Sequence, residues 1–537
     1  MKAWLNSETV RYPLAVLCGV AWALAFPLPG WSGMAWLVPP LLWVGTFGLS
    51  RIEGFRFGYL AGLIHFLILL RWMRHMPVSM GAYAAWVALS AYCALFPAVW
   101  VWVSLGFFKS AASSYSGSDW SRVAVDYVHR SWLERAGLLV ALSAAWVALE
   151  WGRSRLLTGF PWAHLGSSQW QQLPLIQIAS ITGVYGLSFL VCWCGLSLAG
   201  ALLTLGFRPE SRWSWTAETR LPLAITLMVM GWGFWEVMGY RRLEARMGAR
   251  TVKLALVQPS VAQTLLWDPA EEESVFAKIE SLSRQALALK PDVLVWPEGN
   301  FGLSQTNFLR MKTLLAGTKV DWVFCSDDIE ENSTGFARFN AAFHYTAEGQ
   351  LEPSYRKQRL VAFGEYVPLA RWLPFLKWFT PIGEGFQPGN RPSLFRLAGG
   401  SVAAPVICFE DVFPHGIAGH VTSEIDFLLG LANDGWFLES AAQWQHSANA
   451  VFRAVENGVG LVRTCNNGVT GWWDARGTRR STLADTEGGV YSPGILIIAV
   501  PVGLPWVETP YHRYGDVFAG LCTALAGWRM IRAKWRL

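Results

Sequence analysis

VAAPVICFED, residues 402–411, is an apolar run that ends at a thiol followed by two acids. A short apolar run of this kind is typical of a buried strand, and the residues after it indicate a turn and a helical segment. At such a strand end, backbone N–H groups point at the sulfur of Cys408, lower the pKa of the thiol and offer oxyanion donors. A lone cysteine in an apolar strand is more often an inert core residue. A catalytic role for Cys408 therefore requires partner residues from other parts of the chain.

Two further strand ends supply the groups that a cysteine nucleophile requires. Glu298 comes shortly after the apolar run 292–296, and Lys357 ends the run 351–357. A thiol attacks only as the thiolate, so a base must accept its proton, and the oxyanion that forms needs a fixed positive partner. Alternating α/β sheets collect their sites at the carboxyl ends of strands. We therefore expect Glu298 as proton acceptor, Lys357 as oxyanion stabiliser and Cys408 as nucleophile to lie together.

The ordinary explanations of these residues weaken when the residues are taken together. A glutamate at a strand end is more often a cap or a salt-bridge partner, and a lysine in a hairpin strand is more often solvated. However, Glu410 and Asp411 crowd Cys408 and would raise the pKa of its thiol unless a cation compensates. Lys357 is the expected compensating cation.

Residues 241–510 alternate short apolar runs with helical segments, as in an α/β domain. The runs predicted to be strands are 253–257, 292–296, 322–325, 339–345, 351–357, 402–408, 426–431 and 460–464. One helix is expected from Asp268, where acids follow in the first turn, to about Leu289, and another over 440–456.

The rest of the chain has the composition of an integral membrane protein. Of the 537 residues, 53% are hydrophobic and only 15% are charged, and the mean hydropathy is +0.29. A helix needs about 20 apolar residues to cross a bilayer. Candidate runs lie at 12–28, 32–49, 55–72, 79–108, 136–152, 180–206, 220–238 and, more weakly, 514–530.

These runs predict a polytopic α-helical membrane domain with about eight transmembrane helices. Seven helices belong to a membrane domain over residues 1–240. An extracytoplasmic catalytic domain follows over residues 241–510, and residues 511–537 form a C-terminal transmembrane helix and a cytoplasmic tail.

The orientation follows from the basic residues of the short loops, because Lys and Arg are retained on the cytoplasmic side. With the N-terminus inside, the inside set is Lys2, Arg11, Arg51, Arg56, Lys109, Arg122, Arg130, Arg135, Arg208, Arg212, Arg220, Arg529, Arg532, Lys534 and Arg536. The outside short loops hold only Arg71, Arg74, Arg153, Arg155, Arg241 and Arg242. The net charge of +6 is thus mostly a topology signal. No basic cluster is interleaved with exposed aromatic residues, so the positive charge does not indicate nucleic acid as a partner.

The cysteines indicate a free thiol and no metal. Of the eight cysteines, the extracytoplasmic domain holds Cys325, Cys408 and Cys465. This odd number leaves at least one thiol free in a compartment that tolerates disulfides. Cys192 and Cys194 lie inside an apolar span without a histidine or a second cysteine pair, so they do not indicate a metal site.

Large apolar side chains gather among prolines in residues 366–386. The segment contains Leu373, Leu376 and Phe379 and the three expected substrate-entrance residues Trp372, Phe375 and Trp378. Such a segment either packs against the domain or enters the bilayer. We favour the bilayer, because Arg371 and Lys377 can meet lipid phosphates while the rings enter the interface. The segment could also act as a lid between lipid and Cys408.

Together, these residues resemble the nitrilase, or carbon–nitrogen hydrolase, superfamily, whose members carry a Glu, a Lys and a Cys in this chain order. The resemblance to its membrane-embedded branch, the apolipoprotein N-acyltransferases, covers nearly the whole chain. The matching segments of the extracytoplasmic domain are Trp296-Pro297-Glu298, Lys357 with Val361-Ala362-Phe363-Gly364-Glu365, Ile407-Cys408-Phe409-Glu410, Asn433-Asp434-Gly435-Trp436-Phe437, Gln445-His446 and Arg463-Thr464-Cys465-Asn466-Asn467-Gly468. Those of the membrane domain are Gly159-Phe160-Pro161-Trp162 and Gly166-Ser167-Ser168-Gln169.

The resemblance implies a nitrilase-like α-β-β-α sandwich for the extracytoplasmic domain. It implies that an acyl chain passes from a membrane phospholipid, through a thioester on Cys408, to the α-amino group of the diacylglyceryl-cysteine of an apolipoprotein. It also implies supporting roles for Glu365, Glu410 and Phe409 and a position near the substrate entrance for Trp267. Neither a metal nor another cofactor is implied.

Two departures from the family pattern affect the surroundings of the triad. Phe409 stands where a tyrosine is common, which removes a hydroxyl but keeps the ring. Leu438 and Glu439 stand where a small, Gly-rich run is usual. We therefore expect an intact triad and a different local acceptor surface.

The resemblance places the protein in the bacterial inner (cytoplasmic) membrane as a multi-pass protein, with its catalytic domain on the periplasmic side. The expected partners are the lipid bilayer, a phospholipid donor and a diacylated apolipoprotein acceptor. A membrane-tethered nitrilase-type amidase that acts on small amides would use the same triad, but it needs neither the membrane-loop motifs nor the aromatic segment. A non-catalytic lipid-binding scaffold is disfavoured because no triad residue is lost. A polytopic partner of a glycosyl transferase is weaker still, since no transferase domain of that kind is present.

Overall fold

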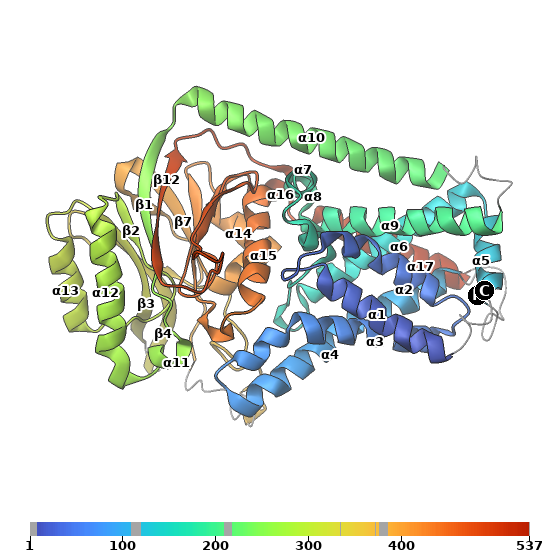
Figure 1. Cartoon of the computed structure of the whole chain (residues 1–537), viewed down its shortest axis with the longest axis horizontal. Coiled ribbons are helices and arrows are strands. Elements are labelled where there is room, and N and C mark those ends of the chain that lie inside the picture. Colours follow the sequence, from blue (N-terminus) through green and yellow to red (C-terminus); the bar gives the residue numbers. More distant parts are fainter. Residues whose placement is uncertain are drawn as a thin grey trace. The chain divides into compact units, whose positions relative to one another are not determined.

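The computed structural model describes residues 8–108, 120–208, 217–332, 335–370, 372–374 and 385–535 (Figure 1). The chain forms two compact units. The first comprises Met1–Arg71, Ala84–Trp235 and Tyr514–Leu537, and the second comprises Trp72–Tyr83 and Glu236–Arg513.

The first unit is helical in the part that is described. Its elements, including those that cross into the second unit, are α1 (Glu8–Leu24), η1 (Ser32–Trp36), α2 (Val38–Gly45), α3 (Arg51–Leu69), η2 (Arg71–His75), α4 (Ser79–Phe108), α5 (Trp120–His129), α6 (Trp132–Arg153), η3 (Leu156–Thr158), η4 (Leu165–Gln169), α7 (Leu173–Ile176), α8 (Ala179–Thr182), α9 (Val184–Phe207), α10 (Ala217–Met247), α16 (Pro510–Tyr514) and α17 (Val517–Trp535).

Five helices among the described residues are long and apolar enough to cross a membrane. They cover Arg51–Leu69, Gly81–Phe107, Trp132–Arg153, Val184–Phe207 and Glu218–Met247. The runs predicted at 12–28 and 32–49 form the shorter apolar helices Arg11–Leu24 and Ser32–Gly45. The prediction of several apolar helices is therefore confirmed, whereas the count of eight transmembrane helices stays a prediction.

Helices α3 and α6 begin at capping boxes. Ser50 accepts a hydrogen bond from the backbone N–H of Glu53, whose carboxylate accepts one from the Ser50 N–H. Ser131 and Glu134 form the same reciprocal pair at the start of α6. Each box satisfies two of the N–H groups that a helix start leaves unpaired. These helix starts are therefore local properties of the sequence.

The motif segment 159–169 folds into the helical unit through polar contacts. Arg153 Nη1 donates to the carbonyl of Trp162 at 2.6 Å, and Glu150 accepts from the backbone N–H of Leu165 at 2.7 Å. Trp162 and Leu165 are both buried. Buried irregular backbone is stable when its polar groups have hydrogen-bond partners, and these contacts supply such partners.

The second unit contains two six-stranded sheets (Figure 1). The first has the order β12-β1-β2-β3-β4-β5, with β1 (Arg250–Gln258), β2 (Val293–Val295), β3 (Asp321–Asn332), β4 (Gly335–Tyr345), β5 (Tyr355–Arg356) and β12 (Gly494–Val502). The second has the order β11-β10-β9-β8-β7-β6, with β6 (Phe395–Leu397), β7 (Ser401–Ile407), β8 (Phe427–Ala432), β9 (Gly460–Cys465), β10 (Gly471–Trp473) and β11 (Arg479–Thr482). In each sheet three consecutive central strands are parallel, namely β1–β3 and β7–β9.

The predicted alternation of strands and helices is confirmed in this unit. The two predicted helices are α12 (Glu272–Ala288) and α15 (Ala442–Asn457). The predicted strand 351–357 is wrong in its length, because only β5 pairs fully and Pro353 offers no N–H to a strand partner. The structure adds elements that were not predicted: α13 (Gln305–Leu315), β6, β10, β11 and β12. Of these, only β12 has an apolar run long enough to be recognised as a strand.

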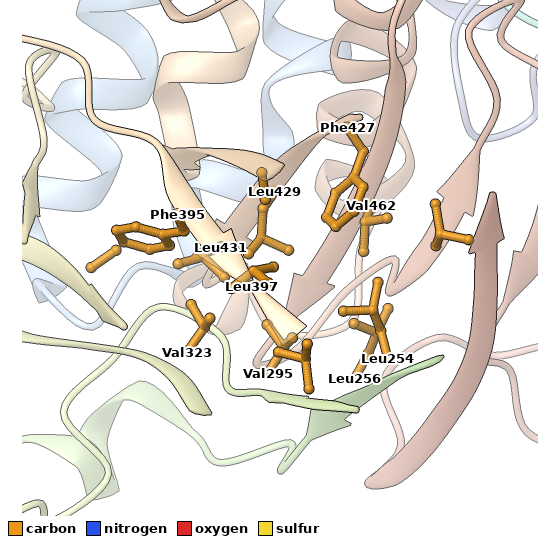
Figure 2. Packing of buried hydrophobic residues seen from close by; sticks show 14 of the residues in the cluster. Leu254, Leu256, Val295, Val323, Phe395, Leu397, Phe427, Leu429, Leu431 and Val462 are labelled. Atoms are coloured by element: carbon orange, nitrogen blue, oxygen red, sulfur yellow. The ribbon is translucent and has the colours of Figure 1, made fainter. Parts of the chain in front are cut away.

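The two sheets pack face to face through a buried apolar core (Figure 2). The first sheet contributes Leu254, Leu256, Val295 and Val323, and the second contributes Phe395, Leu397, Phe427, Leu429, Leu431 and Val462. Every residue of β7 and β8 is buried, which is the pattern of parallel strands covered on both faces. This is why residues 402–408 are apolar without alternation.

Helices cover the outer faces of both sheets. A second apolar cluster joins the first sheet to α12 and α13 and includes Phe276, Met311 and Trp322. On the other side, α15 lies against β9 and against the turn that follows β7. The unit is thus a sandwich of helix, sheet, sheet and helix, and the carboxyl ends of the central strands carry the loops of the site.

The inter-sheet core predicts the effect of a truncation. Leu429→Ala should lower the free energy of unfolding by about 2–5 kcal/mol, because Leu429 is fully buried and the cavity cannot close. Leu309→Ala on α13 should change it by less than about 0.5 kcal/mol, because Leu309 is 56% exposed. Thermal unfolding of the purified chain in detergent measures both. Equal losses for the two variants would contradict the assignment of this core.

Candidate active site

Loops at three strand ends bring Glu298, Lys357 and Cys408 into one site. Glu298 follows β2, Lys357 directly follows β5, and Cys408 follows β7 as the first residue of the turn η9 (Cys408–Val412). Lys357 Nζ lies 3.1 Å from Glu298 Oε1, and the charges of both side chains act on the Cys408 thiol. Acid, amine and thiol therefore lie in one site.

The ammonium of Lys357 lies at the centre of this site. Its Nζ is 3.1 Å from Glu298 Oε1 and 3.0 Å from Glu365 Oε1, and the side chain is 1% exposed. Burial alone would lower the pKa of Lys357, but the charges of Glu298 and Glu365 outweigh burial and hold this pKa well above its ordinary value. Lys357 is therefore a permanent cation.

Asn340 of β4 ties the two carboxylates together. Its Nδ2 donates to Glu298 Oε1 and to Glu365 Oε1, at 2.8 Å in each case. Each oxygen thus accepts from both Asn340 and Lys357, which fixes the orientation of both carboxylates. Asn340 is not among the predicted site residues. Its only signal in the sequence is a single amide inside the apolar run 339–345.

The thiol of Cys408 differs from the other thiols of this unit. Cys408 is partly exposed, whereas Cys325 and Cys465 are buried. Burial of the thiol, together with the nearby charge of Glu298, raises the pKa of Cys408 well above its ordinary value, and the opposing effect of Lys357 is weaker. The expectation of a lowered thiol pKa is therefore wrong. At neutral pH the thiol therefore carries its proton.

Glu410 fixes the turn that presents Cys408. The backbone of Cys408 has φ +53°, a left-handed conformation that costs a non-glycine residue about 1–2 kcal/mol. The Glu410 carboxylate accepts hydrogen bonds from the N–H of Ile407 at 2.8 Å, the N–H of Gln358 at 2.7 Å and the hydroxyl of Tyr355 at 2.9 Å. It thereby joins the nucleophile turn to the loop after β5.

The other predicted supporting residues have more local contacts. Glu365 Oε2 accepts from the backbone N–H of Val361 at 2.8 Å, so this carboxylate also closes its own loop. The ring of Phe409 meets the ring of Phe413 edge to face, with centroids 5.2 Å apart. Phe409 therefore contributes packing beside Cys408.

The predicted entrance residues fall in two places. Trp267 is 43% exposed, and its ring meets that of Trp436 edge to face with centroids 5.0 Å apart. Trp372 is 78% exposed. Phe375 and Trp378 lie outside the described residues.

One departure from the family pattern, at Leu438, is visible in the backbone conformation. It has φ +48° and ψ −166°, a conformation that is essentially restricted to glycine and costs about 1–3 kcal/mol. Gln443 Nε2 donates to the Leu438 carbonyl at 2.6 Å and helps to hold it. The side chain is 48% exposed. An apolar side chain is thus presented where the family usually has a small residue.

Within the described ranges, no group of three or more His, Cys, Asp or Glu side chains is arranged to hold a metal ion. The site instead combines the groups that nucleophilic catalysis needs: a thiol, a carboxylate that can accept its proton, and a fixed cation.

The amino-acid sequence matches known proteins along nearly its whole length. A model of the apolipoprotein N-acyltransferase N-terminal domain matches residues 18–197, and a carbon-nitrogen hydrolase model matches residues 253–499. The apolipoprotein N-acyltransferase of Geobacter metallireducens is 35% identical over 96% of this chain and 93% of its own length. This chain belongs to the apolipoprotein N-acyltransferase family. The Vibrio vulnificus member is 29% identical over 99% of this chain and 100% of its own length.

Among solved structures, the chain is similar to an amidase from Nesterenkonia sp., with 17% identity and a TM-score of 0.37 over 51% of this chain and 96% of the amidase. The family models confirm the resemblance drawn from the motifs, and they do so separately for the helical unit and for the sandwich.

The charge of Lys357 predicts the reactivity of the thiol. In Lys357→Met the cation that lowers the pKa of Cys408 is lost, so this pKa should rise further and alkylation of Cys408 by iodoacetamide at pH 8 should slow by about tenfold or more. Intact mass spectrometry of the folded protein measures the rate. Lys312→Met on α13 is the matched control and should alkylate like the wild type. An unchanged rate in Lys357→Met would show that the ammonium does not act on the sulfur.

Proposed function

We propose that this chain transfers an acyl chain from a membrane phospholipid to the α-amino group of the diacylglyceryl-cysteine of an apolipoprotein. The observation that carries the proposal is that Glu298 and Lys357, 3.1 Å apart, both act electrostatically on the Cys408 thiol in a chain of this family. Phospholipid as donor, diacylated apolipoprotein as acceptor and the bilayer as the place of reaction are all parts of the proposal.

In the first half-reaction, Glu298 accepts the thiol proton and the Cys408 sulfur attacks an ester carbonyl of the phospholipid. Among the described contacts, two of the three N–H groups of Lys357 are taken by Glu298 and Glu365. The third can donate to the oxyanion of the tetrahedral intermediate. When the carbon–oxygen bond breaks, the leaving lysophospholipid oxygen receives the proton from Glu298, and an acyl thioester remains on Cys408.

In the second half-reaction, the neutral α-amine of the acceptor attacks the thioester carbonyl. Glu298 accepts a proton from the attacking nitrogen, Lys357 again supports the oxyanion, and the carbon–sulfur bond breaks. The departing sulfur then recovers its proton from Glu298. The products are an amide and a free Cys408 thiol, so the enzyme returns to its starting state without a cofactor.

The supporting residues act on this triad through the contacts described above. Glu365 keeps Lys357 charged and oriented, and Glu410 holds the turn that presents Cys408. Phe409 keeps its ring beside the nucleophile. Trp267, with Trp436 against it, and the exposed Trp372 are proposed to line the entrance. Phe375 and Trp378 are proposed, from the sequence alone, to line the outer part of the entrance.

The finer topology also belongs to the proposal. It comprises eight transmembrane helices, seven of them in residues 1–240, a catalytic domain over 241–510 on the periplasmic side of the inner membrane, and a last helix with a cytoplasmic tail over 511–537. The five long apolar helices and the bias of basic residues toward one set of loops support it.

The thioester predicts a covalent adduct. After incubation with phospholipid vesicles and no acceptor, the intact mass of the purified protein should increase by one acyl group, and the modified peptide should contain Cys408. Cys408→Ser should abolish both the thioester and N-acylation of a diacylated lipopeptide. Cys325→Ser should preserve both, because Cys325 is buried in the inter-sheet core.

Two results would contradict this function. Full N-acylation by Cys408→Ser would exclude the thioester route. Release of ammonia from small amides, with no transfer to the lipopeptide, would identify the protein as the membrane-tethered amidase considered above.

The proposed topology predicts the behaviour of fusions. Alkaline phosphatase joined after Met247 should be active, because it is exported, and green fluorescent protein joined at the C-terminus should fluoresce, because it stays in the cytoplasm. The opposite pair of results would place residues 241–510 in the cytoplasm.

A further inference from the structure

Four charged side chains lie buried behind the nucleophile turn. They come from four different segments: Asp411 from η9, Asp434 from the loop after β8, His446 from α15 and Arg463 from β9. None is more than 3% exposed. His446 Nδ1 is 2.7 Å from Asp434 Oδ1, and His446 Nε2 is 2.8 Å from Asp411 Oδ1. Arg463 completes the cluster at 3.3 Å from Asp434 Oδ2 and 3.5 Å from Asp411 Oδ2.

With both aspartates ionised, the charges of this cluster balance when His446 is protonated. Asp411 and Asp434 carry two negative charges and Arg463 carries one positive charge. A buried excess charge is costly, so a second cation is required. Each ring nitrogen of His446 faces a carboxylate, and the imidazolium can donate to both, while Arg463 Nη2 lies 2.8 Å from the same Nδ1.

The surrounding groups favour the same protonation state. Burial lowers the pKa of His446, but Asp411 and Asp434 raise it more strongly than burial and Arg463 lower it, to about 9. The titratable groups that face the cluster are Asp411 and Cys408 from η9, Asp434 from the loop after β8, and Arg463 and Cys465 from β9. On α14 (Pro414–Ile417), which also packs against α15, His415 contacts Arg359.

The net charge of the cluster acts on Cys408. Asp411 belongs to the same short turn as the nucleophile, and the charge of Asp434 contributes to the raised pKa of the Cys408 thiol. Arg463 in turn interacts electrostatically with Cys408. A positive charge lost from the cluster would therefore make the thiolate harder to form.

We infer that His446, held as an imidazolium between Asp411 and Asp434, is a positioning residue that keeps the cluster neutral and so allows the Cys408 thiolate to form. His446 acts through Asp411 and Asp434 and makes no contact with substrate. The inference rests on the proposed role of Cys408 as nucleophile and goes beyond it, because none of the four charges belongs to the triad.

Alkylation of Cys408 by iodoacetamide, followed by intact mass between pH 6.5 and 9.5, tests this inference on the full chain in detergent. In His446→Gln the cluster keeps one unbalanced negative charge, so the rate profile should shift by about one pH unit to higher pH and the rate at pH 8 should fall about tenfold. In the double variant Asp411→Asn/His446→Gln the charges balance again. Its rate should return to within about threefold of the wild type.

His344→Gln is the matched control. His344 is also a buried histidine beside a carboxylate, at 3.0 Å from Asp321, but it lies on β4 and outside the cluster. It should lower thermal stability without moving the alkylation profile of Cys408. A wild-type profile in His446→Gln would overturn the inference. So would a double variant that alkylates as slowly as His446→Gln, because that result assigns His446 a packing role only.

Thermal unfolding gives a second test that does not need the single variant to fold. The pKa of His446 is about 9 in the folded protein and about 6.5 when unperturbed. Its contribution to stability is therefore complete below pH 6.5 and is lost as the pH rises through 9. The melting temperature of the wild type should fall over this window by more than that of the double variant. Equal falls would overturn the inference.

Failure of the inference is distinguishable from failure of the proposed function. The alkylation profiles report only on the thiol of Cys408 and require no lipid. Acyl transfer that persists in Cys408→Ser would remove the proposed function whatever the profiles of the His446 variants.

Discussion

The buried ammonium of Lys357 is the interaction on which the site depends. A cation that is 1% exposed is stable only with anionic partners, and removal of one partner of a buried ion pair costs about 3–5 kcal/mol. Its partners are Glu298, 3.1 Å away after β2, and Glu365, 3.0 Å away in the loop after β5. Asn340 on β4 bonds both carboxylates. The first sheet and its loops therefore supply the carboxylates and the ammonium of the site. The second sheet supplies the thiol.

The surroundings of Cys408 keep its thiol protonated. The thiol pKa is raised by burial and by Glu298, so the proton stays on the sulfur at neutral pH. Lys357 lowers the pKa of this thiol, and the cluster of Asp411, Asp434, His446 and Arg463 adds no net charge while His446 is protonated. The balance of the buried charges around Cys408 thus sets the reactivity of its thiol.

Particular residues show how far sequence reasoning reached. That Glu298, Lys357 and Cys408 lie in one site could be predicted because each comes at or shortly after the end of an apolar run, and α/β domains collect their sites at such strand ends. Asn340 could not, because one polar residue inside an apolar strand does not reveal which carboxylates it meets. The direction of the thiol pKa shift was also missed, since it depends on the relative strength of burial, Glu298 and Lys357. Motif residues such as Asp434 and His446 were recognised by resemblance, but their contacts join four separate segments of the chain.

The sequence by itself determined the local and additive properties of the protein: several long apolar helices, the capping boxes of α3 and α6, the buried parallel strands, the family and the identities of the acid, the amine and the thiol. These follow from composition, periodicity and short motifs. The tertiary structure decided the properties that depend on distance between remote residues. It brought the carboxylates of Glu298 and Glu365 to the same ammonium, reduced the strand before Lys357 to two residues, and raised the pKa of the Cys408 thiol. Electrostatic energies depend on separation and burial, and neither is encoded in the spacing of residues along the chain.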